Sequence, residues 1–142
     1  MAYLTSVRRK CREALLVNTA LEHDLHQGGR HVPPVLIYIA SPYTDLSPIV
    51  REMRARSAAR YAAQLCNNGT HCFSPIAHGH AFTEFDVPLD FAFWKAFNAR
   101  FLSLCDEMHV LMLQGWEKSA GVTDEIECYA RAGKPILYIP VP

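Results

Sequence analysis

The sequence predicts an α/β domain in which helices cover both faces of a parallel sheet. Short, almost continuously apolar segments such as 35–40 are typical of strands that are buried on both faces. They alternate with longer segments in which apolar residues recur every three or four positions, as in amphipathic helices. Strands that alternate with helices along a chain favour a parallel sheet. The 142 residues are enough for one such domain.

We expect the segment 31–142 to be this single domain, with a sheet of four to five strands. The apolar runs that predict strands are 35–40, 70–73, 107–113 and 135–139. The helical patterns cover 49–66, 90–104 and 122–132. Asparagine and glycine at 67–69 and Gly133 are typical helix ends, and Asp90 is a typical N-cap residue. We expect the segment 81–88 to be irregular.

Residues 1–30 predict a helical extension in front of this domain. Its apolar positions share helical spacing: Leu4, Val7, Cys11, Ala14, Leu15, Leu21 and Leu25. The basic segment 8–12 is similar to the start of a transit peptide, but Glu13, Glu22 and Asp24 do not fit one. A helix used for packing or for contacts between subunits is the better interpretation.

The composition of the chain disfavours two classes of partner, nucleic acids and membranes. Fourteen Lys and Arg residues balance fourteen Asp and Glu residues, so the chain lacks the excess of cations that a nucleic-acid binder needs. The longest apolar runs fall far short of the ~20 residues that cross a bilayer. The five cysteines are odd in number and form no C-x-x-C pair, which favours reduced thiols. We therefore expect a cytoplasmic protein that binds neither nucleic acid nor membrane.

Several common ligand-binding motifs are absent from the sequence. It contains no G-x-G-x-x-G after the first strand and no G-x-x-x-x-G-K-[ST], which disfavours a Rossmann dinucleotide site and a P-loop. It also contains no G-x-S-x-G, which disfavours a serine hydrolase. We expect no cofactor.

Glu125 is the residue most suggestive of catalysis. The helix pattern places it in the first turn of the last helix, where backbone N–H groups and the helix dipole favour an ionised carboxylate. An ionised carboxylate that faces a pocket is suited to act as a nucleophile. An acidic residue that merely complements the dipole is the alternative.

Other polar residues follow the predicted strands, where parallel sheets bind ligands. His78 and His80 are interpreted as contacts to the polar edges of a substrate rather than as a metal pair. Trp116 either covers a flat ring or packs in the core. A zinc site at Cys66, His71 and Cys72 is disfavoured because neighbouring strand residues point to opposite faces. We expect no metal.

Several segments resemble the nucleoside 2-deoxyribosyltransferase-like superfamily, most closely its small uncharacterised bacterial and phage members. They lie within 35–140 and are Ile37-Tyr38-Ile39-Ala40-Ser41-Pro42-Tyr43-Thr44, Cys105-Asp106-Glu107, Gly115-Trp116, Ser119-Ala120-Gly121-Val122-Thr123-Asp124-Glu125 and Gly133-Lys134-Pro135. The pattern Ser-x-Gly-Val-x-x-Glu also matches the deoxynucleoside 5′-monophosphate N-glycosidase branch. The resemblance implies a flavodoxin-like three-layer sandwich and a homodimer or larger homo-oligomer.

The resemblance also implies a reaction. Glu125 occupies the position of the glutamate that attacks C1′ of a (deoxy)ribose, so that the base leaves and water or a second base takes the sugar. Asp90 is the candidate general acid, with Glu84 and Asp86 as alternatives. Substrate contacts are expected from the three loop segments that follow the predicted strands, 41–44, 74–80 and 114–125. The residues are Ser41, Tyr43, His78, His80, Trp116, Ser119 and Gly121. Residues matching Ser41 and Ser119 hold a 5′-phosphate in the monophosphate branch, which has an arginine where this chain has Tyr43.

Two other functions stay open from the sequence. The same fold could bind or sense a nucleoside or nucleotide without turning it over. A small metal-dependent hydrolase that uses His78 and His80 is the third hypothesis.

Overall fold

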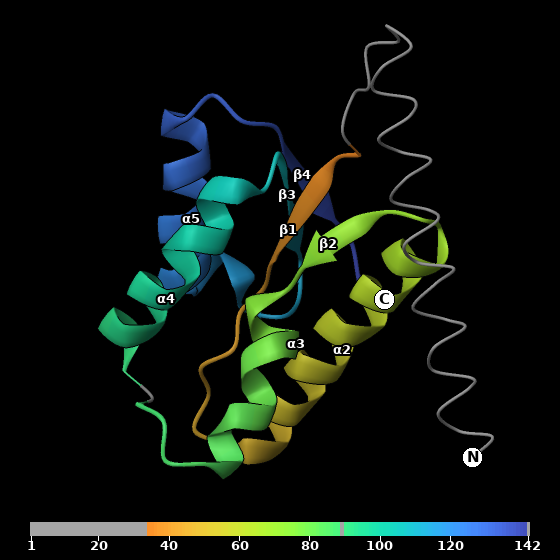
Figure 1. Cartoon of the computed structure of the whole chain (residues 1–142). Helices are drawn as coiled ribbons and strands as arrows, with labels where there is room; N and C mark the ends of the chain where they lie inside the picture. Colours follow the sequence, from red (N-terminus) through yellow and green to blue (C-terminus); the bar gives the residue numbers. More distant parts are fainter. Residues whose placement is uncertain (1–33, 89, 142) are drawn as a thin grey trace, which may run out of the picture. The chain divides into compact units, whose positions relative to one another are not determined.

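The computed structural model describes residues 34–88 and 90–141 (Figure 1). The helix predicted for residues 1–30 lies outside the described residues. The segment Pro34–Pro142 forms one compact unit.

Four parallel strands form the sheet in the spatial order β2-β1-β3-β4. The strands are β1 (Leu36–Ala40), β2 (His71–Phe73), β3 (Glu107–Leu111) and β4 (Ile136–Ile139). Tyr38 in β1 lies opposite Phe73 in β2 and Met108 in β3. The predicted parallel sheet is confirmed, and its order is that of the first four strands in flavodoxin-like folds. The strand predicted at 107–113 ends at Leu111.

Helices cover both faces of the sheet and complete three layers. They are α2 (Pro48–Asn67), α3 (Pro75–Gly79), α4 (Phe91–Leu104) and α5 (Ala120–Arg131), with 3-10 turns η1 (His80–Glu84) and η2 (Trp116–Lys118). Figure 1 shows α4 and α5 on one side of the sheet and α2 and α3 on the other. Among the helices that the structure describes, none has the length and apolar character needed to span a bilayer.

The segment after β2 is more regular than the sequence predicts. Ser74 caps α3, because its Oγ accepts a hydrogen bond from the N–H of Ala77 at 3.2 Å. Pro75 occupies the first position of this helix, where its missing N–H costs nothing. The predicted loop 74–80 and the irregular segment 81–88 therefore contain a short helix and a 3-10 turn.

The core is divided by the sheet. Toward α4 and α5 the alternate residues Tyr38, Ala40, Met108 and Val110 are buried with Tyr129. Toward α2 the buried cluster consists of Ile37, Ile39, Ala58 and Leu111. Both faces of β1 and β3 are thus apolar, which explains the continuous apolar runs in the sequence.

The connections leave a crevice beside the end of β1. From β1 the chain crosses to β2 on one side of the sheet, whereas from β3 it crosses to β4 on the other side. The loops that follow β1 and β3 therefore diverge at the carboxyl ends of these neighbouring strands. In open α/β sheets this is the usual place of a ligand site.

Candidate active site

A cavity of about 1200 Å³ lies at this divergence of the two loops. Its walls come from the loops after β1 and β3, the beginning of α2, the α3–η1 segment, one face of α4 and the first three turns of α5. Of the residues that the sequence predicts for the site, six line it: Ser41, Tyr43, His80, Ser119, Gly121 and Glu125. These come from three loop regions that are distant in the sequence.

Glu125 and Tyr38 meet in the cavity wall. Tyr38 lies in β1 with its ring fully buried, and its hydroxyl donates a hydrogen bond of 2.6 Å to Oε1 of Glu125. Burial and the neighbouring Glu125 raise the pKa of Tyr38, so its hydroxyl stays protonated and remains a donor. The bond fixes one carboxylate oxygen of Glu125.

The pKa of Glu125 is raised to about 7, chiefly because burial disfavours the charged carboxylate. The hydrogen bond from Tyr38 opposes this shift, and the charge of Asp124 adds to it. The sequence predicts instead that the helix start keeps Glu125 ionised. A pKa near 7 leaves Glu125 only partly ionised at neutral pH, since α5 begins at Ala120 and Glu125 lies in its second turn, beyond the strongest effect of the dipole.

Ser119 and Gly121 bring the N-terminus of α5 to the cavity. Ser119 is the N-cap, and its Oγ accepts a hydrogen bond of 3.4 Å from the N–H of Val122. Ser41 follows β1 on the opposite side of the crevice and is 6% exposed. Its Oγ has no hydrogen-bond partner among the described residues. The cavity thus holds a helix start that attracts anions and a hydroxyl that is available to a ligand.

His80 links two other cavity residues. Its Nδ1 is 2.9 Å from the hydroxyl of Tyr43, and its Nε2 is 2.7 Å from Oε2 of Glu52 in α2. Tyr43, Glu52 and His80 all line the cavity. The chain Tyr43–His80–Glu52 therefore holds the first loop against the α2–η1 wall.

Arg54 ties the loops after β1 and β3 together. Its guanidinium donates to the backbone carbonyls of Tyr43, at 3.3 Å, and Thr44, at 2.8 Å, and to that of Gln114 at 3.1 Å. It also forms an ion pair of 3.7 Å with Asp45. The sequence does not single out Arg54, since arginines are frequent in that helix and only the fold shows which one turns to the crevice.

Asn98 is a second cavity residue that the sequence does not indicate. It lies on the face of α4 that also turns Trp94, Lys95 and Leu102 to the cavity. Its Oδ1 is buried without a hydrogen-bond partner among the described residues. Lys95 is paired with Asp124 of α5 at 2.6 Å, which leaves Asn98 as the uncharged polar group in this wall. Like Arg54, it lies inside a helix, so the sequence does not show that its side chain turns to the cavity.

The predicted general acid lies outside the cavity. Asp90 caps α4, with its Oδ1 accepting a hydrogen bond of 2.9 Å from the N–H of Phe93. The alternatives Glu84 and Asp86 are exposed and also lie outside the cavity lining. The structure therefore does not bring a second carboxyl group from this segment to Glu125.

His78 and Trp116 also lie outside the cavity. The His78 ring packs among aromatic side chains, with its centroid 4.9 Å from that of Phe82 and 6.2 Å from that of Phe97. Trp116 packs against the buried core and lies 5.4 Å from the ring of Tyr138. Of the two interpretations of Trp116, the structure supports the packing role.

Metal ligands do not gather in the described part of the chain. Among residues 34–88 and 90–141, no three side chains of His, Cys, Asp or Glu are arranged to hold an ion. His78 and His80 belong to different surroundings, as described above. The geometry therefore gives the metal-dependent hydrolase no support.

Comparison with known proteins places the chain in a family defined by sequence. A comparison with curated proteins gave no match. The sequence model described as "Domain of unknown function (DUF1937)" matches residues 35–140, which include the sheet and the lining of the cavity. The chain therefore belongs to the DUF1937 family.

Proposed function

We propose that this protein cleaves or transfers at the N-glycosidic bond of a (deoxy)nucleoside or its 5′-monophosphate, with Glu125 as the nucleophile. The observation that carries the proposal is the Glu125 carboxyl group, which lines the cavity while Tyr38 holds one of its oxygens at 2.6 Å. The other oxygen, Oε2, is available to a substrate. A volume of about 1200 Å³ is sufficient for a nucleotide.

The proposed reaction is a double displacement. Ionised Glu125 attacks C1′ of the sugar, and the base departs with the electron pair of the N-glycosidic bond and takes up a proton. This step leaves a glycosyl ester on Glu125. Water or a second base then attacks C1′, releases the sugar product and restores the carboxylate.

A 5′-phosphate on the substrate would bind at the start of α5. Ser41 and Ser119 supply hydroxyl groups, and the first residues of α5 line the same cavity, where a helix start favours an anion. Two cavity cations, Arg51 of α2 and Lys118, form no ion pair with a described carboxylate. These cations would compensate for the absence of an arginine at position 43.

The second candidate function is a module that binds nucleosides or nucleotides without turnover. Asp90 favours it, because its carboxylate caps α4 and lies outside the cavity. The cavity carboxylates other than Glu125 are engaged: Asp45 with Arg54, Asp124 with Lys95, and Glu52 with Arg56 and His80. An enzyme that releases a base needs a group that protonates this base as it departs. The paired carboxylates do not readily supply that proton.

We further propose that the protein works as a homodimer or larger homo-oligomer in the cytoplasm. One side of α4 leaves Phe93, Phe97 and Leu104 partly exposed, and their spacing of four and seven residues places them in one stripe. Exposed apolar stripes of this kind are typical of subunit interfaces. The described cysteines are free thiols, which agrees with a reducing compartment.

The decisive experiment incubates the protein with a panel of nucleosides and 5′-monophosphates and detects free base by chromatography. Release of base by the wild-type protein and its loss in Glu125→Gln would support the proposal. Glu127→Gln is the matched control, because Glu127 is an exposed glutamate of the same helix outside this cavity. Saturable binding without product would favour the binding module. Full activity of Glu125→Gln would exclude Glu125 as the nucleophile.

A further inference from the structure

Two cysteines meet on the α2 face of the sheet, outside the cavity lining. Cys66 lies near the end of α2 and Cys72 lies in the middle of β2, and their Sγ atoms are 3.9 Å apart. A short turn connects the two elements, with Gly69 at a positive φ of 75°. Sulfurs at this separation are in van der Waals contact, so little movement is needed to join them.

The two thiols differ in their surroundings. Cys66 is exposed to solvent, whereas Cys72 is half-buried with its Sγ 3.6 Å from the carbonyl oxygen of Ala62. Burial, and next the contact with Cys66, raise the pKa of Cys72 to about 11. A reagent in solution therefore reaches Cys66 first, and Cys72 is held directly behind it.

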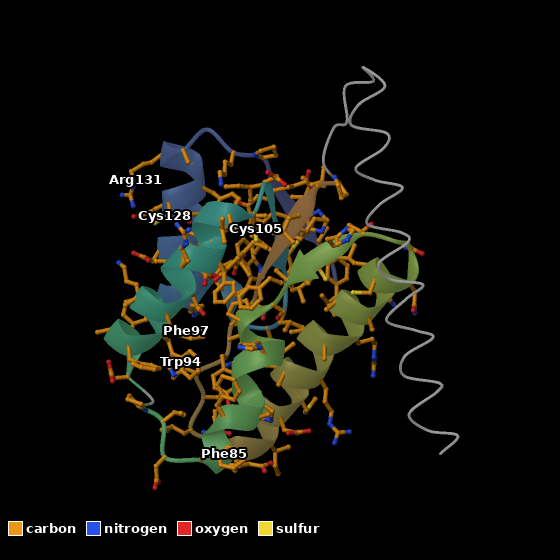
Figure 2. The ribbon with its side chains drawn as sticks, in the orientation of Figure 1. Phe85, Trp94, Phe97, Cys105, Cys128 and Arg131 are labelled. Carbon is orange, nitrogen blue, oxygen red and sulfur yellow. The ribbon has the colours of Figure 1, made fainter. Side chains whose placement is uncertain are left out.

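The other described cysteines have no such arrangement. Cys105 is completely buried, and the Sγ of Cys128 accepts a hydrogen bond of 3.4 Å from Arg131. Figure 2 shows Cys128 and Arg131 together on α5, across the sheet from α2. Among the four cysteines between residues 34 and 141, Cys66 and Cys72 are the pair with contacting sulfurs.

We propose that Cys66 and Cys72 form a reversible thiol pair that small disulfides of the glutathione disulfide type oxidise to an intramolecular disulfide. The Cys66 thiolate attacks one sulfur of the reagent, breaks its S–S bond and releases one thiolate. The Cys72 thiol then loses its proton to solvent, and its sulfur attacks Cys66 and expels the second thiolate. The two cysteines give up two electrons and two protons, and the reagent is reduced to two thiols.

The bond requires the sulfurs to approach from 3.9 Å to about 2.05 Å, which rotation about the two Cα–Cβ bonds can supply. The disulfide would fasten the end of α2 to β2. This matters because β2 has only three residues and, among the described strands, pairs with β1 alone. The proposal does not depend on the reaction proposed for Glu125.

Trypsin makes the test direct, because the segment 61–95 contains no internal Lys or Arg and carries Cys66 and Cys72 as its only cysteines. The folded full-length protein is incubated with glutathione disulfide, denatured, alkylated and digested. We expect the alkyl groups on this peptide to fall from two to none, with loss of two hydrogen atoms. The peptide 101–118, which carries buried Cys105, keeps its label.

Two variants separate the steps. Cys72→Ser lacks the resolving thiol and should accumulate one glutathione adduct on Cys66, whereas Cys66→Ser should leave Cys72 unmodified. Two alkyl groups remaining on the wild-type peptide would overturn the proposal. An adduct that forms on Cys72 but not on Cys66 would do the same.

Discussion

The hydroxyl of Tyr38 and the carboxyl group of Glu125 form a 2.6 Å hydrogen bond that joins the central strand β1 to helix α5. Burial disfavours the charge of Glu125, and this bond is the main interaction that favours it. The balance leaves the pKa of Glu125 at about 7, where a small change in pH or in the bond alters the fraction ionised. The pKa of the proposed nucleophile is therefore lowered by a neutral hydrogen-bond donor rather than by a cation.

Tyr38→Phe should raise the pKa of Glu125 further, because it removes the hydrogen bond that lowers it. We expect the acid limb of kcat/KM for base release to move from about pH 7 to a value about one pH unit higher. Activity at pH 7 should therefore fall about fivefold, because the ionised fraction of Glu125 falls from about one half to about one tenth, while the plateau at high pH changes less. Rates for the wild type and the variant between pH 5 and pH 9.5 provide the measurement. An unshifted limb with a uniformly lower rate would show that Tyr38 only positions Glu125.

Glu125 should also make the folded protein less stable as pH rises. Its folded pKa of about 7 exceeds the value of about 4.3 expected in the unfolded chain, so the folded state holds more protons between these pH values. Its contribution to the free energy of unfolding therefore falls from about pH 4.3 to about pH 7, by at most about 1.4 kcal/mol per pH unit, and is constant above. Gln at position 125 does not titrate and can still accept the Tyr38 hydrogen bond.

Urea unfolding at pH 5 and pH 8 tests this prediction. We expect Glu125→Gln to gain about 2 kcal/mol relative to the wild type between the two pH values. Comparing the two proteins at each pH cancels the titration of the other groups. A difference in stability that is the same at both pH values would mean that Glu125 titrates in its ordinary range.

The fold was predictable because its signal is local. The apolar run 35–40 and the repeat of strand and helix determine the sheet without knowledge of any distant contact. The start of α5 was placed two residues late, because Ala120 and Gly121 carry no apolar periodicity and the N-cap bond of Ser119 is visible only in the structure. Because of this shift Glu125 lies in the second turn, where the dipole does less to offset the effect of burial, and its carboxyl group is only partly ionised at neutral pH.

The site was predictable only in part. Ser41, Tyr43 and Ser119 follow strands directly, so the topology alone brings them to the cavity. Arg54 and Asn98 lie inside helices, where their direction depends on how each helix packs on the sheet. His78 precedes His80 by two residues, but α3 and η1 turn the two rings to different surroundings, one to aromatic residues and one to the cavity.

Asn98→Leu should stabilise the protein and weaken its binding of a ligand. The buried Oδ1 of Asn98 lacks a partner among the described residues, and such an atom costs about 1–3 kcal/mol. Removing it should raise Tm by a few degrees, since 1 kcal/mol corresponds to about 2–8 °C in domains of this size range. If the amide contacts a nucleoside, the variant should bind it about tenfold more weakly.

Differential scanning fluorimetry and calorimetric titration measure the two effects separately. Ala99→Leu is a suitable control, because it adds apolar volume at the neighbouring cavity position without removing a polar group. A Tm that falls in Asn98→Leu would mean that the amide has a partner in solution. Equal affinity in both variants would show that Asn98 does not contact the ligand.

The exposed stripe of α4 formed by Phe93, Phe97 and Leu104 should determine the oligomeric state. The structure buries no described residue of α4, and Phe93 and Leu104 are 37% and 55% exposed. We expect the double variant Phe93→Lys, Leu104→Lys to be a monomer in light scattering coupled to size-exclusion chromatography. The wild-type protein should have at least twice that mass.

Met53→Lys is the control, because Met53 is 62% exposed on α2, across the sheet from α4. Since burying the stripe of a second copy would remove several aromatic side chains from water, two lysines there should oppose association strongly. A wild-type protein that is already monomeric, or an oligomer that Met53→Lys disrupts equally, would place the interface elsewhere.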